Sequence, residues 1–407
     1  MKLKAISYLA VGAMVALTAC SHEGDNFGDR VLFTGTENSP VVKFLCDGMS
    51  STALTVTSTA KATADVHITV KAAPELLDAY NKKYNRSFVA PEPSMYQLEG
   101  TDAVIKAGSS MSSQIKISSN SESLAEGVGY MLPITITEVN GDGLGVIESS
   151  RTAYVQFTKV VTIKAGLLNL NGAYEVPAFR HTDENPSPVR ALGQMTLEMK
   201  VFPLSFGRSQ YGIGTLVGCE ENFLFRFGGG DGTGDNNLQF VKGSIGDDPH
   251  PDKKQHYENL KIGDFDTGRW IHFAAVYDGT NLTIYRDCER ISTIETSGGT
   301  INLSMAYNGS SGWFDTFTIG SSCHNRFFHG YISECRVWTV PRSVADLENG
   351  ICYVDPTSDG LLACWRFDGE TNEDGSIRDV TGHGYDAVAP SWASGGVQWV
   401  EGQKCPY

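Results

Sequence analysis

The residues best suited to chemistry in this sequence are aromatic side chains on polar loops. Trp313 lies in the glycine-rich stretch Tyr307–Asp315 rather than in an alternating strand pattern. A sugar ring stacks its apolar face on an aromatic side chain, while nearby Asn, Asp or Arg side chains bind its hydroxyls. Asn308 and Asp315 are close enough in sequence to Trp313 for that second role. We predict a sugar-binding site at Trp313, with packing of this residue in the core as the alternative.

Two further aromatic residues lie on polar segments. Tyr211 follows Arg208-Ser209-Gln210, and Trp392 lies within Ser391–Ser394. Both segments lack the period-two alternation that marks a half-buried strand. We predict that Tyr211 assists Trp313 and that Trp392 is a third ligand-contacting candidate.

A glycine-rich loop at 228–237 offers oxygen ligands for a hard cation. Asp231, Asp235 and Asn236 lie among five glycines there. Calcium binds six to eight oxygens from carboxylates, amides and backbone carbonyls. The loop therefore predicts a calcium site at these three residues, and a turn without an ion is the alternative.

Known catalytic patterns are missing from the sequence. Retaining glycosidases place two carboxylates about 5 Å apart, often as E-x-D-x-E on one strand, and no such triplet occurs. Glu220 and Glu221 are adjacent, so on a strand they point to opposite faces. The histidines lack metal-ligand spacing, and His272 alternates with strand residues, which predicts a packed and hydrogen-bonded histidine. We expect no catalysis, with a glycosidase of unrecognised pattern as an alternative.

The N-terminus has the pattern of an export signal. Two lysines precede an apolar run of about 15 residues, which is too short to span a bilayer comfortably. The run ends in Leu17-Thr18-Ala19-Cys20, which resembles the lipobox of bacterial lipoproteins. The resemblance implies a signal peptide at 1–19, lipidation of Cys20, a polar tether at 20–29 and attachment to the membrane by the lipid alone. Acidic residues behind Cys20 resemble the surface-export tag of Bacteroidetes lipoproteins, which implies exposure on the outer membrane.

The negative charge of the chain limits the kinds of partner that it can bind. The net charge of −15 becomes about −17 when Lys2 and Lys4 leave with the signal, so nucleic acids and anionic membranes are disfavoured as partners.

Eight cysteines remain besides Cys20, an even number that permits disulfides in an exported chain. Several lie within apolar strand patterns, so we expect mostly free, buried thiols, with Cys335–Cys364 as a candidate bridge.

Short alternating segments predict an all-β chain. Val66, Ile68 and Val70 alternate with polar residues, a pattern typical of half-buried strands. One helix is predicted from Pro74 to about Asn85, because Leu76, Leu77, Tyr80 and Tyr84 form an apolar stripe.

The segment 30–160 resembles a known domain. Its ordered motifs are Leu77–Asn81, Ile105–Gly108 and Tyr130–Ile134. They resemble the N-terminal domain of unknown function found in Bacteroidetes surface lipoproteins, an immunoglobulin-like sandwich with a short helix. The resemblance implies a spacer role, and we expect Tyr80 and Tyr130 to be packing residues.

The segment 165–407 resembles a second family. Four motifs support this, at Gly268–Asp278, Phe328–Trp338, Gly360–Phe367 and Asp379–Gly384. Their order is similar to the laminin-G-like, concanavalin A-like jelly roll, whose concave face often holds carbohydrate. The resemblance implies that Trp270, Trp338 and Trp365 are core residues. The linker between the domains is predicted near Lys159–Ala165.

These observations favour one function over two alternatives. We expect a non-catalytic surface glycan-binding lipoprotein that serves a glycan utilisation system beside a glycan importer. An adhesin that binds protein is the main alternative, and a glycosidase is the third.

Overall fold

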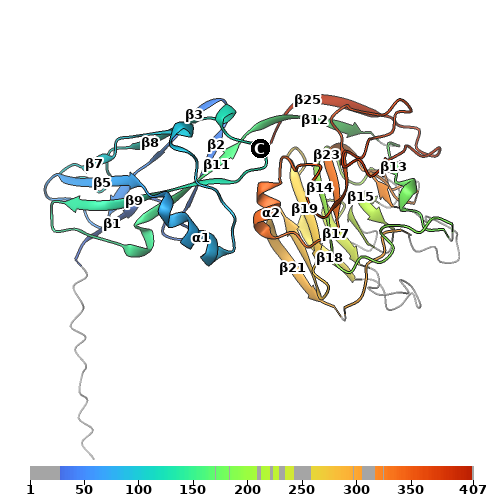
Figure 1. Ribbon diagram of the computed structural model, residues 1–407, viewed down its shortest axis with the longest axis horizontal. Helices are drawn as coiled ribbons and strands as arrows, with labels where there is room; N and C mark the ends of the chain where they lie inside the picture. Colours follow the sequence, from blue (N-terminus) through green and yellow to red (C-terminus); the bar gives the residue numbers. More distant parts are fainter. Residues whose placement is uncertain are drawn as a thin grey trace, which may run out of the picture.

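The structure is a computed structural model in which the chain folds into two β-sandwich domains side by side (Figure 1). It describes residues 28–405 apart from 170, 183, 209–211, 221–222, 229–233, 243–257, 297, 305–316 and 324. The predicted all-β class is confirmed. Within these described residues, no helix is both long and apolar enough to cross a membrane.

Three sheets form the first domain, in the orders β10-β1-β4, β2-β11-β9-β5-β7 and β3-β8-β6. Alternate side chains of β5, Val66, Ile68 and Val70, are buried in a common core, as their period-two pattern predicts. The strands are β1 (Arg30–Phe33), β2 (Val41–Cys46), β3 (Met49–Leu54), β4 (Val56–Ser58), β5 (Val66–Ala72), β6 (Tyr96–Glu99), β7 (Asp102–Ile105), β8 (Ile115–Asn120), β9 (Tyr130–Asn140), β10 (Gly145–Val146) and β11 (Thr152–Lys159).

The predicted helix of this domain is confirmed. A 3-10 turn at Pro74–Leu76 leads into α1 (Leu77–Tyr84), and Asn85 ends the helix in the left-handed conformation with φ of 50°. Pro74 suits the first turn because its missing N–H has no intrahelical partner there. Tyr80 and Tyr130 are both buried, as expected of packing residues.

Two large sheets enclose the core of the second domain. An eight-stranded sheet runs β21-β20-β19-β14-β23-β12-β25, with β24 paired to β23, and a six-stranded sheet runs β13-β22-β15-β16-β17-β18. The strands are β12 (Val161–Leu168), β13 (Tyr174–Glu175), β14 (Met195–Pro203), β15 (Gly214–Cys219), β16 (Phe223–Phe227), β17 (Asn237–Lys242), β18 (Glu258–Asp264), β19 (Ile271–Tyr277), β20 (Asn281–Arg286), β21 (Glu289–Glu295), β22 (Thr318–Ile319), β23 (Gly330–Trp338), β24 (Leu361–Arg366) and β25 (Val397–Cys405).

A second short helix corrects the expectation of a single one. Helix α2 (Val344–Asn349) begins at a capping box in which Ser343 and Asp346 bond each other's backbone N–H. It lies on the side of the eight-stranded sheet that faces the first domain (Figure 1). Its buried Leu347 packs with Ala274 and Val276 of β19. Six residues give less than two turns, too few for the apolar periodicity on which the prediction relied.

The two domains meet over a very short connection. Only Val160 separates β11 from β12, and β12 pairs antiparallel with the last strand, β25, beside it in Figure 1. Most of the predicted linker Lys159–Ala165 is therefore strand, although the exact domain boundary stays a prediction. Arg86 of the first domain forms a 3.0 Å ion pair with Glu348 of α2.

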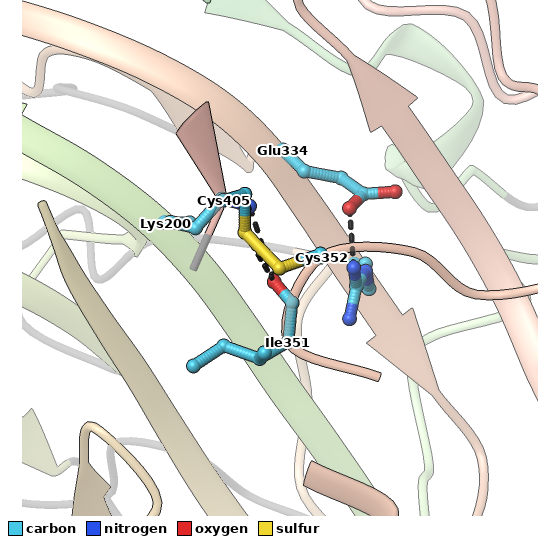
Figure 2. Close-up of a disulfide and its surroundings, with 6 residues drawn as sticks. Lys200, Glu334, Ile351, Cys352 and Cys405 are labelled. Carbon is cyan, nitrogen blue, oxygen red and sulfur yellow. Dashed lines mark hydrogen bonds and ion pairs between the residues drawn. A yellow bond between two sulfur atoms is a disulfide. The ribbon is translucent and has the colours of Figure 1, made fainter. Parts of the chain in front are cut away.

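The candidate bridge Cys335–Cys364 is wrong. Both are free and buried, and Cys335 packs in the core between the sheets while Cys364 lies in a separate cluster beside Trp338. A disulfide cannot join two cysteines whose side chains point to opposite faces of a sheet unless the backbone moves. Cys352 and Cys405 instead form a disulfide (Figure 2), and the other six cysteines of the described part form none, in line with the expectation of mostly reduced thiols.

Candidate functional site on the six-stranded sheet

The outer face of the six-stranded sheet carries polar side chains. In β16, Phe223, Phe225 and Phe227 belong to the core between the two sheets. Because successive side chains of a strand point to opposite faces, Arg226 points away from this core. The neighbouring strands place Thr215 of β15 and Gln239 of β17 opposite Arg226. The result is a transverse polar row, Thr215–Arg226–Gln239, on the outer face.

The polar row is held by bonds among its members and by a nearby carboxylate. Arg226 Nε donates to Gln239 Oε1 at 3.3 Å, and its Nη1 lies 3.5 Å from Oε1 of Glu220. Thr215 Oγ1 lies 2.6 Å from the hydroxyl of Ser322. All of these side chains are buried, so the row is fixed in place and is not itself open to a ligand.

A second arginine completes the cluster. Arg326 Nη1 donates to the same Oε1 of Glu220, and its backbone carbonyl accepts from Thr215 N at 2.9 Å. The Arg326 side chain is 15% exposed, against 3% for Glu220. Glu220 Oε2 and Arg326 Nε have no hydrogen-bond partner within the described structure. Both atoms are themselves buried, so within this cluster only the rest of the Arg326 side chain is open to a ligand.

Most of the residues predicted to bind sugar lie outside the described residues. These are Trp313, Asn308, Asp315 and Tyr211, together with the predicted calcium ligand Asp231. Their roles stay predictions.

Trp392 is described, and it lies at an edge of the polar face. Its Nε1 donates to Oε1 of Glu175 in β13 at 3.1 Å. Its ring centroid is 6.1 Å from that of Phe327, the residue after Arg326. Trp392 is half-buried, so part of its surface stays open. The structure therefore brings one predicted aromatic residue near the polar row, although its binding role stays a prediction.

Two of the predicted calcium ligands are described. Asp235 is exposed, and a Cβ atom at Gly207 or Gly212 would clash with its carboxylate oxygens. Asn236 Nδ2 donates to the carbonyl of Phe265 at 3.1 Å. Within the described residues, no group of three or more His, Cys, Asp or Glu side chains could hold a metal ion. Calcium binding stays a prediction.

A second buried charge cluster lies on the outer face of the eight-stranded sheet. His272 Nε2 lies 3.0 Å from Glu198 Oε2, which confirms the predicted packed and hydrogen-bonded histidine. Arg336 contacts both Glu198 and Glu334. Burial raises the pKa of Glu334, but Arg336, Arg366 and Lys200 together more than offset this and the pKa falls to about 2. Glu334 is therefore ionised at neutral pH and cannot act as a general acid.

The tryptophans assigned to the core by the family motifs are confirmed there. Trp338 and Trp365 are fully buried, and Trp270 is nearly so. The sequence analysis missed the polar row and its arginines. The run Phe223–Phe227, in which one arginine alternates with three phenylalanines, is the signal that could have found Arg226.

Comparison with known proteins agrees with this architecture. Residues 27–143 match a family described as an N-terminal domain, and residues 182–348 match the concanavalin A-like lectin/glucanases superfamily. The predicted pairing of an N-terminal domain with a concanavalin A-like domain is confirmed. No curated protein matches the chain.

Several solved structures are similar to the chain at low identity. A proposed carbohydrate binding protein from Bacteroides ovatus is 25% identical over 91% of this chain and 97% of its own, with a TM-score of 0.48. The CBM40 of a Ruminococcus gnavus IT-sialidase is 14% identical over 46% and 96%, with a TM-score of 0.32. A SAP-like pentraxin from Limulus polyphemus is 12% identical over 58% and 96%, with a TM-score of 0.30. Because these TM-scores are low, none of these likenesses assigns a function to this chain.

Proposed function

We propose that the protein is a non-catalytic glycan-binding protein and that its ligand contacts the outer face of the six-stranded sheet. The observation that supports this most is the cluster of Glu220, Arg226 and Arg326 beside the polar row. It lies in a domain that matches a superfamily of lectins and glucanases.

The chemistry of the cluster suits sugar hydroxyls. A hydroxyl donates one hydrogen bond and accepts others. The partly exposed guanidinium of Arg326 carries several N–H donors for a hydroxyl oxygen, and its Nη1 stays anchored on Glu220. Arg326 is the contact residue in this proposal because it is the more exposed of the two, and Glu220 orients it. Trp392, and Trp313 on its loop, would supply the apolar face for a ring.

The location of the protein is part of the same proposal. Lipidation of Cys20 would anchor the chain in the outer membrane, and residues 20–29 would hold the domains clear of the lipid. The first domain would serve as a spacer. A surface protein of this kind would pass glycan to a neighbouring importer.

A glycan array with the mature protein, followed by calorimetry on the best ligand, tests the proposal. Arg326→Ala should weaken binding at least about tenfold, because a charge-assisted hydrogen bond contributes about 1.5–3 kcal/mol. Thr293→Ala is the matched control, since Thr293 is an exposed hydroxyl residue on the eight-stranded sheet. It should leave the affinity unchanged.

Two outcomes would count against the proposal. Failure of every glycan on the array to bind would remove the function itself. Equal affinity in wild type and Arg326→Ala, with a bound glycan, would keep the function and move the site elsewhere.

A further inference from the structure

The two sulfur atoms of the disulfide lie in very different surroundings. The bond joins Cys352, just after helix α2, to Cys405 at the end of β25 (Figure 2). Cys405 is fully buried, whereas Cys352 is only half-buried. Cys352 also lines a cavity of about 350 Å³ together with Lys164, Tyr353 and Arg366. A small molecule in this cavity therefore has access to Cys352 and not to Cys405.

A buried lysine contacts the inaccessible sulfur. Lys200 Nζ lies 3.1 Å from Cys405 Sγ and 3.1 Å from the carbonyl oxygen of Ile351, as Figure 2 shows. Lys200 is 2% exposed. Glu334 lies opposite it on β23 but bonds Arg336 and Arg366 instead. Nζ therefore faces the disulfide.

We propose that this disulfide is a site of thiol–disulfide exchange with small thiols, in which Cys352 is attacked and Cys405 leaves as a thiolate stabilised by Lys200. The incoming thiolate forms a bond to Cys352 Sγ, and the bond between the two cysteines breaks. The electron pair of that bond goes to Cys405 Sγ, and Lys200 Nζ donates a hydrogen bond to the new anion. The step needs no other oxidant or reductant, because the incoming thiolate itself reduces the disulfide.

The direction of exchange follows from access and leaving-group stability. Exchange requires that the thiolate reach one sulfur, and it is faster when the departing sulfur is the better leaving group. A thiolate in a fully buried position is costly unless an opposite charge accompanies it. Burial lowers the pKa of Lys200 to about 7, so a substantial fraction of Nζ is protonated at neutral pH and supplies that charge at Cys405, whereas Cys352 borders the cavity. Both requirements therefore favour attack at Cys352.

Exchange would release a segment at the contact between the domains. Cys352 and Tyr353 line a second, smaller cavity together with Glu126 and Gly127 of the first domain. Strand β25 keeps its pairing with β12 when the disulfide opens. Opening would therefore free the segment after α2 without removing a strand from the sheet.

The wild-type mature protein gives the first test. It is treated with 2-mercaptoethanol under native conditions and then unfolded in guanidinium chloride with excess iodoacetamide, which alkylates the otherwise buried Cys405. The protein is digested, and the peptides are identified by mass spectrometry. The expected product carries 2-mercaptoethanol on Cys352 and carbamidomethyl on Cys405. A mixed disulfide on Cys405, or no reduction of the folded protein, would overturn the proposal.

Variants test the role of Lys200 as a positioning residue. Lys200→Gln should lower the rate of reduction by dithiothreitol at pH 7 at least about tenfold, because the leaving thiolate loses its partner. Lys164→Gln is the control, since Lys164 lines the same cavity and is about half exposed. It should change the rate by less than about twofold. Equal rates in Lys200→Gln and wild type would refute the assignment.

A pH profile separates this role from a structural one. In the reduced protein, the pH at which the Cys405 thiolate forms, followed by its ultraviolet absorbance, should be higher in Lys200→Gln than in wild type. The other ionisable side chains near Lys200 are Glu334 and Arg336 on β23 and His272 on β19, and both proteins retain them. An unchanged profile would contradict the proposal. If Lys200→Gln does not fold, the wild-type trapping experiment decides alone.

Discussion

Replacing Glu334 by glutamine measures what the buried ionic network contributes to the second domain. Glu334 Oε1 accepts from Arg366 Nε at 3.2 Å and from the Cys364 thiol at 3.1 Å, and Oε2 accepts from Arg336. The carboxylate is nearly fully buried. Its removal leaves two guanidinium groups with less compensating charge.

The pKa of Glu334 gives the magnitude and the pH window. Burial by itself raises this pKa. Arg336, Arg366 and Lys200 act in the opposite direction and more strongly, so the pKa falls from 4.5 to about 2. A pKa lowered from 4.5 to about 2 corresponds to about 3 kcal/mol of stability in the ionised state. As the pH falls below about 4.5, the carboxyl of the unfolded chain binds a proton first. The contribution is therefore complete above pH 4.5 and is lost as the pH falls toward 2.

Urea unfolding followed by tryptophan fluorescence is the appropriate assay. All six tryptophans follow residue 165, so the signal reports the second domain alone. At pH 7, Glu334→Gln should lower the free energy of unfolding by about 3 kcal/mol. The difference from wild type should shrink as the pH approaches 2. Glu295→Gln, an exposed carboxylate on β21, is the matched control and should change stability by less than about 0.5 kcal/mol.

The reasoning fails if the difference between Glu334→Gln and wild type does not change between pH 7 and pH 3. That result would show that the cost of the substitution comes from packing or from an unpaired amide. If the free energy of unfolding falls by less than about 1 kcal/mol at pH 7, the attraction within the buried ion pairs barely exceeds the cost of removing their charges from water.

Four further predictions test the sequence interpretation. Cys20→Ala should release the protein from the membrane fraction, as fractionation would show. Millimolar calcium should raise the melting temperature if the 228–237 loop binds it, because binding to the folded state stabilises by mass action. Trp313→Ala should weaken glycan binding about thirtyfold in calorimetry with no change in melting temperature, whereas Trp338→Ala should cost about 3–5 kcal/mol of stability. A fragment of residues 161–407, which keeps β12 whole, should unfold cooperatively in a thermal melt.

The predictions that the structure confirms rest on local sequence patterns. The alternation in β5 and the apolar stripe of α1 depend only on neighbouring residues, so both can be read from the sequence. The same holds for His272, whose place in an alternating strand indicated a packed side chain. Family motifs located the core tryptophans.

Long-range partners could not be predicted in this way. Cys352 and Cys405 are 53 residues apart, and only the fold brings the segment after α2 beside β25. Glu220 and Arg326 are separated by 106 residues, so no local pattern links them. Arg226 could be assigned an outward direction, but its partners depend on strand order. The sequence therefore indicates which side chains leave the core and not which of them meet.

Comparison of the two buried carboxylates explains why the six-stranded sheet is the better candidate for binding. Glu334 and Glu220 are almost equally buried, and each contacts two arginines. Both oxygens of Glu334 have partners, although Nε of Arg336 in the same network has none within the described structure. Only one oxygen of Glu220 has a partner in the described structure, and Arg326 keeps an unbonded Nε on a partly exposed side chain. A buried polar atom without a partner costs about 1–3 kcal/mol. Both networks carry that cost, but both carboxylate oxygens are bonded only in the Glu334 network, so Glu220 is the carboxylate with an acceptor left over.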